Sequence, residues 1–203
     1  MSELLGTDTP GIYLLPLLFV VLLLIGWLVY RSRQRAKRSL ASILATIAYE
    51  RMERLVIPNT DDGEIQIDHV VLTAEGLLIV DVKDVVGAVF GSDKMQDWTV
   101  ISDNHRFTFS NPQPALYDRI AAVKEIVRQV PVTGRVVFLD GGRFTKGIPS
   151  MTCGLDELLE EFNEPEKSSA IAKVEAVRPH WEQLKSRALI VPQVQKGRRR
   201  MRA

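Results

Sequence analysis

The most constraining feature of this 203-residue sequence is an uncharged apolar run, GIYLLPLLFVVLLLIGWLVY, at residues 11–30. A helix rises about 1.5 Å per residue, so a run of this length spans roughly 30 Å, the thickness of the hydrocarbon core of a bilayer. Tyr13, Trp27 and Tyr30 lie near the ends of the run, where aromatic side chains favour the membrane interface. We therefore predict a transmembrane helix over residues 11–30.

A cleaved signal peptide is the competing interpretation of this run, because it also places an apolar segment near the N-terminus. A signal peptide starts with basic residues and ends at a small-residue cleavage site. Here the acidic residues Glu3 and Asp8 precede the run, and Gly-Trp-Leu-Val-Tyr ends it. These features favour an uncleaved anchor.

Basic residues follow the run directly, and none precedes it. They are Arg31, Arg33, Arg35, Lys37 and Arg38. The positive-inside rule then places the C-terminal side in the cytoplasm and residues 1–10 on the other side. We expect a single-pass protein of the cell inner membrane, in which residues 31–38 form a basic juxtamembrane segment that contacts lipid headgroups. A nucleic-acid-binding arm is the alternative role of this segment.

The remaining sequence predicts one domain at residues 39–162, followed by a linker, a charged helix and a basic tail at residues 163–203. Apolar residues make up 46% of the chain, which is enough for a packed core. The single cysteine, Cys153, excludes a disulfide framework and a cysteine-based zinc cluster.

The pattern of apolar residues predicts an α+β or α/β fold with a central sheet for this domain. Helical spacing predicts helices over residues 39–50, 114–130 and 154–162, and a charged helix over residues 170–189 that breaks near Pro179. Alternation and turn residues predict a hairpin over residues 65–84, strands over residues 54–58, 85–91, 98–102, 105–110, 135–140 and 148–153, a turn at residues 59–63 and a loop at residues 141–147.

The hairpin IQIDHVVLTAEGLLIVDVKD, residues 65–84, carries charges where a buried strand would avoid them. A turn within TAEG, residues 73–76, pairs Leu72 with Leu77 for a loop of two or of four residues. The same register sets Asp68 opposite Asp81 and Gln66 opposite Lys83. A three-residue loop with a bulge would shift this pairing by one residue.

Opposed carboxylates repel each other across a sheet, so something must offset that repulsion. A divalent cation such as Mg²⁺ does so, because it binds through one or two carboxylates and retained water. Asp68 and Asp81 are the predicted metal ligands. Lys83 would orient or deprotonate an attacking water or stabilise phosphorane charge, and Gln66 would position water or substrate. A solvated sheet edge with a simple Asp–Lys ion pair is the alternative interpretation.

The hairpin, followed by Gly87 and Trp98, resembles the nuclease-related domain (NERD) family, as does the Asn-Pro element of NPQPALYDRIAAVKEI, residues 111–126. The resemblance covers roughly residues 42–160 and implies a restriction-endonuclease-like mixed sheet flanked by helices, in a membrane-anchored bacterial protein. It also implies that Asp68 and Asp81 are the metal-ligand carboxylates, that Lys83 is the catalytic lysine and that Gln66 is the accompanying polar residue.

One departure from the family pattern concerns the first helix, SLASILATIAYERMER, which lacks the Gly-Glu pair whose glutamate joins the site. Glu50 and Glu53 are the nearest carboxylates, and neither is assigned to the site by sequence. Three functions therefore stay open: Mg²⁺-dependent hydrolysis of nucleic acid at the cytoplasmic face, a catalytically degenerate binding or scaffold module, and a membrane-assembly protein that binds another protein.

Other residues of the domain have simpler interpretations. His69 points to the face opposite Asp68, which favours a packing role over a ligand role. Trp98 is expected in the core rather than as a platform for a base. Arg143 and Lys146 lie in a loop that is solvated or contacts phosphates.

Overall fold

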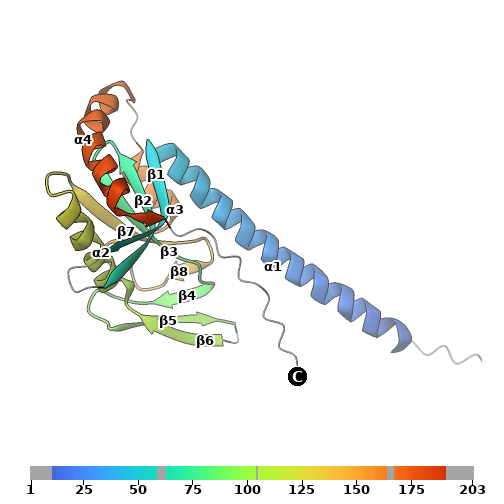
Figure 1. Ribbon diagram of the computed structural model, residues 1–203. Helices are drawn as coiled ribbons and strands as arrows, with labels where there is room; N and C mark the ends of the chain where they lie inside the picture. Colours follow the sequence, from blue (N-terminus) through green and yellow to red (C-terminus); the bar gives the residue numbers. More distant parts are fainter. Residues whose placement is uncertain (1–10, 59–62, 104, 164–166, 191–203) are drawn as a thin grey trace, which may run out of the picture. The chain divides into compact units, whose positions relative to one another are not determined.

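The computed structural model describes residues 11–58, 63–103, 105–163 and 167–190 (Figure 1). The predicted segment at residues 1–10, the turn residues 59–62, part of the 163–169 linker and the basic tail lie outside the described residues. The chain divides between Ser39 and Leu40 into two units.

A single helix, α1 (Gly11–Ile47), runs through the predicted apolar and basic segments and most of the predicted helix over residues 39–50. Within the described ranges, no helix combines the length and the hydropathy needed to cross a membrane. The C-terminal end of α1 belongs to the second unit, where Leu40, Ile43, Leu44 and Ile47 are buried. Their spacing of three and four residues puts them on one helix face, as the sequence predicts.

The larger sheet has the strand order β10-β1-β2-β3-β7-β9 in the described part of the chain. These strands are β1 (Glu50–Pro58), β2 (Glu64–Thr73), β3 (Gly76–Lys83), β7 (Val132–Phe138), β9 (Thr152–Cys153) and β10 (Leu189–Ile190). Strands β1, β2 and β3 are antiparallel, whereas β7 is parallel to β3 and to β9. The sheet is therefore mixed, and the predicted α+β class is confirmed.

The β2–β3 hairpin has the predicted register near its turn. Leu72 pairs with Leu77, and Thr73 pairs with Gly76 around a two-residue turn. Gly76 has a φ of 128°, and a Cβ added there would lie 2.3 Å from the carbonyl oxygen of Pro131. Only glycine fits this turn, because other residues rarely adopt that backbone conformation and would meet Pro131.

A second, smaller sheet has the order β6-β5-β4-β8 among the described strands. It consists of β4 (Gly87–Phe90), β5 (Asp97–Ser102), β6 (His105–Ser110) and β8 (Gly142–Phe144). The parallel pair β3–β7 continues into the parallel pair β4–β8, so both strands pass from one sheet to the other together. The carboxyl end of β3 therefore lies at the junction of the two sheets (Figure 1).

The smaller sheet is held to the larger one by aromatic packing. Trp98 is fully buried, and its ring lies 6.2 Å from the ring of Phe138 on β7 and 5.8 Å from the ring of Phe144 on β8. Aromatic pairs at such separations add roughly 0.5–1.5 kcal/mol beyond their burial. Trp98 is thus a core residue, as predicted.

Helix α2 (Pro112–Ile126) begins two residues earlier and ends four residues earlier than predicted. The side-chain oxygen of Asn111 accepts a hydrogen bond from the backbone N–H of Gln113 at 2.9 Å, which caps the helix. Gly134 of β7 lets the helix approach closely, because a Cβ there would lie within 3.0 Å of Leu116 and Ile120. The Asn-Pro element and this glycine together fix the position of α2 on the sheet.

Helix α3 (Leu155–Phe162) is present as predicted. Three other elements differ from the prediction. Strand β8 lies in the predicted loop, and only β9 remains of the strand predicted over residues 148–153. Helix α4 (Lys167–Arg187) contains Pro179 without interruption. Burial on both sides of this proline, by Val174 and by Trp181, stabilises the continuous helix against the lost hydrogen bond.

Glu50 ties helix α4 to strand β1. Its carboxylate accepts a hydrogen bond from the indole Nε1 of Trp181 at 2.7 Å and one from the Nη1 of Arg178 at 2.5 Å. Trp181 is 1% exposed, so its indole N–H depends on this acceptor because water does not reach it. Glu50 is therefore a structural residue.

We expect Glu50→Ala to lower the free energy of unfolding by about 1–3 kcal/mol, because it leaves the buried Trp181 N–H unpaired. Urea denaturation of the full-length chain measures this loss. Glu53→Ala is the matched control, since Glu53 is a half-exposed carboxylate on the same strand. Unchanged stability in Glu50→Ala, with a loss of Mg²⁺ binding, would contradict the structural assignment.

Candidate functional site

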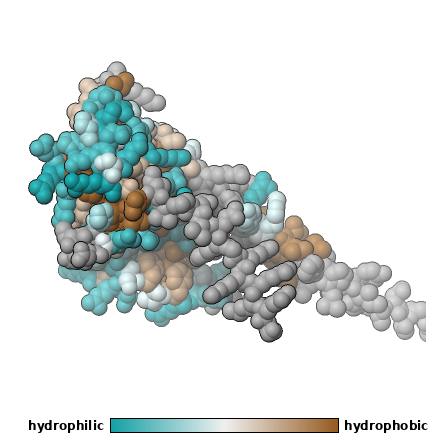
Figure 2. Space-filling view, in the orientation of Figure 1, coloured by the Kyte–Doolittle hydropathy of each residue, from teal (hydrophilic) through white to brown (hydrophobic). Residues whose placement is uncertain are grey.

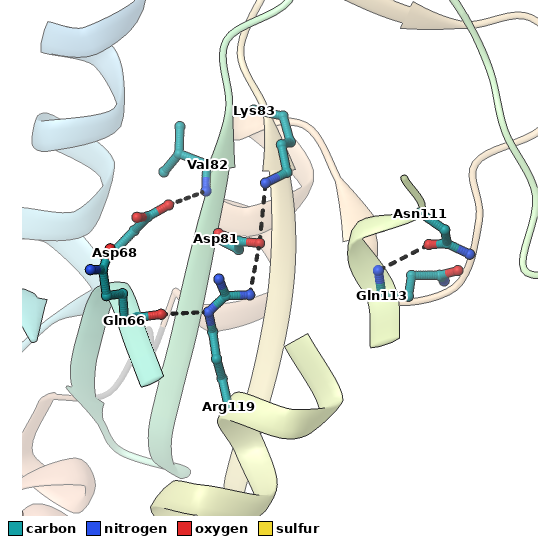
Figure 3. A network of polar contacts seen from close by, with 8 residues as sticks. All are labelled: Gln66, Asp68, Asp81, Val82, Lys83, Asn111, Gln113 and Arg119. Atoms are coloured by element: carbon teal, nitrogen blue, oxygen red, sulfur yellow. Dashed lines mark hydrogen bonds and ion pairs between the residues drawn. The ribbon is translucent and has the colours of Figure 1, made fainter. Parts of the chain in front are cut away.

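The predicted Asp81 and Lys83 lie together at the carboxyl end of β3 (Figure 3). The Nζ of Lys83 is 3.3 Å from the Oδ2 of Asp81, and the Nη1 of Arg119 on α2 is 3.4 Å from the same oxygen. Asp81 is 3% exposed in a strand that is otherwise apolar up to this residue. One buried carboxylate therefore receives two cations from different elements.

The ionised form of Asp81 is disfavoured in spite of these cations. Burial raises the pKa of Asp81 above its ordinary value, and the positive charge of Lys83 only partly opposes that effect. A hydrogen bond with the Asp68 carboxyl raises the pKa of Asp81 further, and Arg119 lowers it. Desolvation of the Asp81 carboxylate thus outweighs the attraction of the two neighbouring cations.

Asp68 reaches the same place from β2, where its side chain is exposed. Its Oδ2 accepts a hydrogen bond from the backbone N–H of Val82 at 3.2 Å (Figure 3). The β2–β3 ladder has His69–Val80 as its last backbone pair in the described strands. The side chain of Asp68 thus replaces the backbone partner of Val82 and brings the two carboxyl groups together.

The backbone around Asp68 is distorted on its other side as well. The β1–β2 ladder pairs Glu53 with His69 and Leu55 with Ile67, and the intervening Arg54 has a φ of 53°. A non-glycine residue in this region costs roughly 1–3 kcal/mol, and such strain gathers at functional sites. The strained Arg54 lies beside Asp68, between the two flanking pairs of the ladder.

Gln66 departs from the prediction. It does not pair with Lys83, because the ladder ends before either residue and Gln66 pairs with Val56 of β1. Its backbone carbonyl oxygen accepts a hydrogen bond from the Nε of Arg119 at 2.7 Å. The ladder also ends one pair short of Asp68 and Asp81, but their carboxyl groups form a hydrogen bond, so the two residues face each other as predicted. Gln66 contributes its main chain to the cluster rather than its amide.

Arg119 is the residue that sequence reasoning missed. It links Gln66 on β2 to Asp81 on β3 and is 22% exposed. Its position three residues after Leu116 and one before Ile120, both buried, places it at the edge of the apolar face of α2. A cation at the border of a helix face that covers a sheet is the signal that would have identified it.

A cavity of about 500 Å³ opens at this cluster. Its lining includes Asp81, Lys83, Arg119, Phe107, Phe109 and Asn111. This volume lies within the range of small-molecule sites. Two cations and two carboxylates, those of Asp81 and Asp84, therefore line a space large enough for a phosphate-bearing ligand.

The donor set fits a hard divalent cation such as Mg²⁺. Asp68 and Asp81 supply carboxylate oxygens, which such a cation prefers, and Mg²⁺ keeps several of its waters. The raised pKa of Asp81 is the observation that favours an additional positive charge here. Across the described ranges, no group of three or more His, Cys, Asp or Glu side chains could hold a metal. A cation at this place would therefore be held by these two carboxylates and by water.

Other predicted candidates lie away from this cluster. Glu50 binds Trp181 and Arg178, and Glu53 lies 3.7 Å from Arg51. Neither replaces the glutamate that the first helix lacks. Arg143, on β8, lines a different cavity.

Cys153 is buried, and burial raises the pKa of its thiol to about 12. A thiol protonated in this way is a poor nucleophile and a poor metal ligand.

Comparison with known proteins identifies the family of the chain. The profile of the family described as "Nuclease-related domain" (NERD) matches residues 30–139, which is more than half of the chain. An uncharacterized protein of Bacillus anthracis is 25% identical to the chain over 99 residues, which are 49% of this chain and 47% of that protein. The chain thus spans about half the length of this curated relative. No solved structure matches the chain.

His69, beside Asp68 on β2, is half-buried. Its buried Nδ1 has no hydrogen-bond partner among the described residues and lies 4.0 Å from the Oε1 of Glu53. Burial lowers the pKa of His69 below the ordinary value of 6.5, and Glu53 and Asp68 only partly oppose this shift. Folding therefore favours the neutral form of His69.

We expect this histidine to make the protein less stable in mild acid. As the pH falls below 6.5 toward the lowered value, the unfolded chain binds a proton that the folded chain resists. The free energy of unfolding then decreases by at most about 1.4 kcal/mol per pH unit from this one group. His69→Gln should flatten this slope in urea denaturation between pH 7 and pH 5, roughly the range in which histidine titrates. His105→Gln, at an exposed position on β6, is the control, and an equal slope in wild type and His69→Gln would refute the assignment.

Proposed function

Because the chain belongs to the nuclease-related domain family, we propose that residues 39–162 hydrolyse phosphodiester bonds of nucleic acid with the help of Mg²⁺. The observation that carries this proposal is the buried Asp81 carboxylate, which Asp68, Lys83 and Arg119 approach. Asp81, Lys83 and Arg119 line one cavity. The restriction-endonuclease-like architecture implied by the family resemblance is part of the same proposal. The mixed sheet, with helix α2 beside the cluster, is consistent with it.

Asp68 and Asp81 would hold the cation in this proposal. When bound, Mg²⁺ supplies positive charge that polarises a phosphate oxygen and favours ionisation of an attacking water. Its binding also requires Asp81 in the ionised form, so it would lower the raised pKa of that residue. Metal binding would thus explain why the buried end of β3 carries a carboxylate, that of Asp81.

Lys83 and Arg119 would act on the phosphate itself. In hydrolysis, the oxygen of water bonds to phosphorus, the ester P–O bond breaks and the leaving oxygen takes a proton. Lys83 lines the cavity, and its Nζ could orient the water or stabilise negative charge on the phosphate. Gln66 and Asp81 hold the guanidinium of Arg119 in place. Arg119 would therefore lose less side-chain entropy when it binds a phosphate.

A second function, binding without cleavage, has one specific observation in its favour. Arg119 already pairs with the carboxylate that would hold the metal, and neither Glu50 nor Glu53 joins the site. A cation fixed beside Asp81 competes with Mg²⁺ electrostatically. Such a site would keep a phosphate on Lys83 and Arg119 and would not cut it.

We expect the Asp81→Asn substitution to separate these two functions. In the wild type, Mg²⁺ at about ten times its dissociation constant should add about 1.4 kcal/mol of stability. That corresponds to a rise of roughly 3–6 °C in Tm, and the rise should vanish in Asp81→Asn. Cleavage of a labelled oligonucleotide should fall at least about 100-fold, as when one preorganised active-site group is removed.

The matched control is Asp118→Asn, an exposed carboxylate on α2 outside the cavity, which should behave as wild type. Nuclease activity that survives in Asp81→Asn would refute the proposed site. Oligonucleotide binding in the wild type with neither cleavage nor a metal-induced rise in Tm would establish the binding function instead. In that case, Arg119→Gln should produce a Mg²⁺-induced rise in Tm that the wild type lacks, because it removes the positive charge that competes with the metal.

We propose further that the apolar run at residues 11–30 anchors this domain to the inner membrane, with residues 39–162 in the cytoplasm. The run is uncharged and lies within α1. Between Val20 and Leu28 its large apolar side chains are about half exposed, and Figure 2 shows them as a brown surface on the right. Lipid is the partner whose chemistry fits such a surface, and the basic residues that follow favour anionic headgroups.

We expect the full-length chain to stay in the membrane pellet after an alkaline carbonate wash. Leu23→Arg combined with Leu24→Arg should release it, because each arginine at the centre of a span costs about 2.5–3.5 kcal/mol. The control substitutes the same residues with alanine. Release of the wild-type chain by carbonate would contradict an integral anchor.

A further inference from the structure

One wall of the cavity beside Asp81 is aromatic, and its residues have no role in the proposed hydrolysis. This wall consists of Phe107 and Phe109 on β6, the edge strand of the smaller sheet, and it faces the same space as Lys83 and Arg119. The two phenylalanines are two residues apart on one strand, so they lie on one face. The wall therefore comes from a different sheet from the one that carries Asp81.

The two rings of this wall have different surroundings. Phe109 is half-buried, and its ring lies 6.2 Å from that of the core residue Trp98. The ring of Phe107 lies 6.2 Å from that of Phe109, and the residue is 45% exposed. Phe109 is thus fixed by the core and supports Phe107, whose outer face remains accessible in the cavity.

The exposed ring of Phe107 and the nearby cations Lys83 and Arg119 are complementary to the base and the phosphate of a nucleotide. A base stacks on an aromatic ring, and its phosphate pairs with lysine and arginine. In a duplex, both faces of each base are covered by its neighbours, so an aromatic side chain stacks best on bases that are unpaired or splayed out. The cavity volume of about 500 Å³ accommodates a ligand of this size.

We propose that this site takes single-stranded nucleic acid, with an unpaired base stacked on Phe107 and its phosphate on Lys83 and Arg119. This inference rests on the proposed function, because it names the substrate class of the same site. It adds Phe107 as the residue that selects a single strand over a duplex. Phe109 positions Phe107 from behind and does not contact the base.

The test measures binding apart from cleavage. Fluorescence anisotropy is recorded with the full-length chain in a nonionic detergent and excess EDTA, using labelled oligothymidylate and its duplex with oligoadenylate. The wild type should bind the single strand more tightly than the duplex. The basic segments of the chain attract both probes, so the ratio of the two affinities isolates the contribution of the cavity.

Phe107→Leu keeps an apolar side chain but removes the aromatic face. It should weaken single-strand binding by roughly 5- to 150-fold, the loss expected for one stacked base, and should leave duplex binding unchanged. Phe107→Tyr should keep the affinity, because it keeps the ring. Tyr117→Leu is the matched control, since Tyr117 is an exposed aromatic residue on α2 that does not line the cavity.

Equal affinity of wild type and Phe107→Leu for the single strand would overturn this inference, and so would a preference for the duplex. Equal losses on both probes would show a general effect on the surface and overturn it too. If the preference disappears while cleavage still depends on Asp81, the inference fails and the hydrolase proposal stands. If the preference for the single strand holds without any cleavage, the inference stands and the hydrolase proposal fails. Labelled oligouridylate in parallel distinguishes RNA from DNA, because only RNA offers a 2′-hydroxyl.

Discussion

The arrangement of side chains at the end of β3 depends on the buried carboxylate of Asp81. A charge that is 3% exposed at the end of an apolar strand needs compensation, and two elements supply it. Lys83 lies two residues away on β3, and Arg119 comes from α2. The Asp68 carboxyl from β2, which forms a hydrogen bond with Asp81, disfavours the charge. Burial still raises the pKa of Asp81, so the cluster as it stands favours one more positive charge.

The same carboxylate explains local features that otherwise look unrelated. The β2–β3 ladder ends at His69 and Val80, since beyond it Asp68 takes the N–H of Val82 and Arg119 takes the carbonyl of Gln66. Arg119 can do this because α2 lies close to β7, where Gly134 leaves room for Leu116 and Ile120. A glycine on strand β7 thus helps to position a cation on helix α2, and the carboxyl end of β3 lines the cavity.

Much of this arrangement was accessible from sequence because it depends on short-range patterns. Alternation along residues 65–84 and the TAEG turn predicted the hairpin register, and the confirmed pairs run from Thr73–Gly76 to His69–Val80. Extrapolating that register predicted Gln66 opposite Lys83, which was wrong, because sequence patterns assume an unbroken ladder. Pro179 failed as a helix breaker for a similar reason, since burial of Val174 and Trp181 outweighs one lost hydrogen bond.

By itself, the sequence determined the uncharged run at residues 11–30, the α+β class and the grouping of Asp68, Asp81 and Lys83 around one hairpin. These follow from periodicity and from residue spacing, which a linear pattern records completely. Only the tertiary structure decided that Arg119 completes the cluster, that Glu50 fastens α4 and that Phe107 faces the same cavity. Each of these contacts joins residues that are far apart in the chain, and their meeting depends on how helices and sheets pack, which no local pattern encodes.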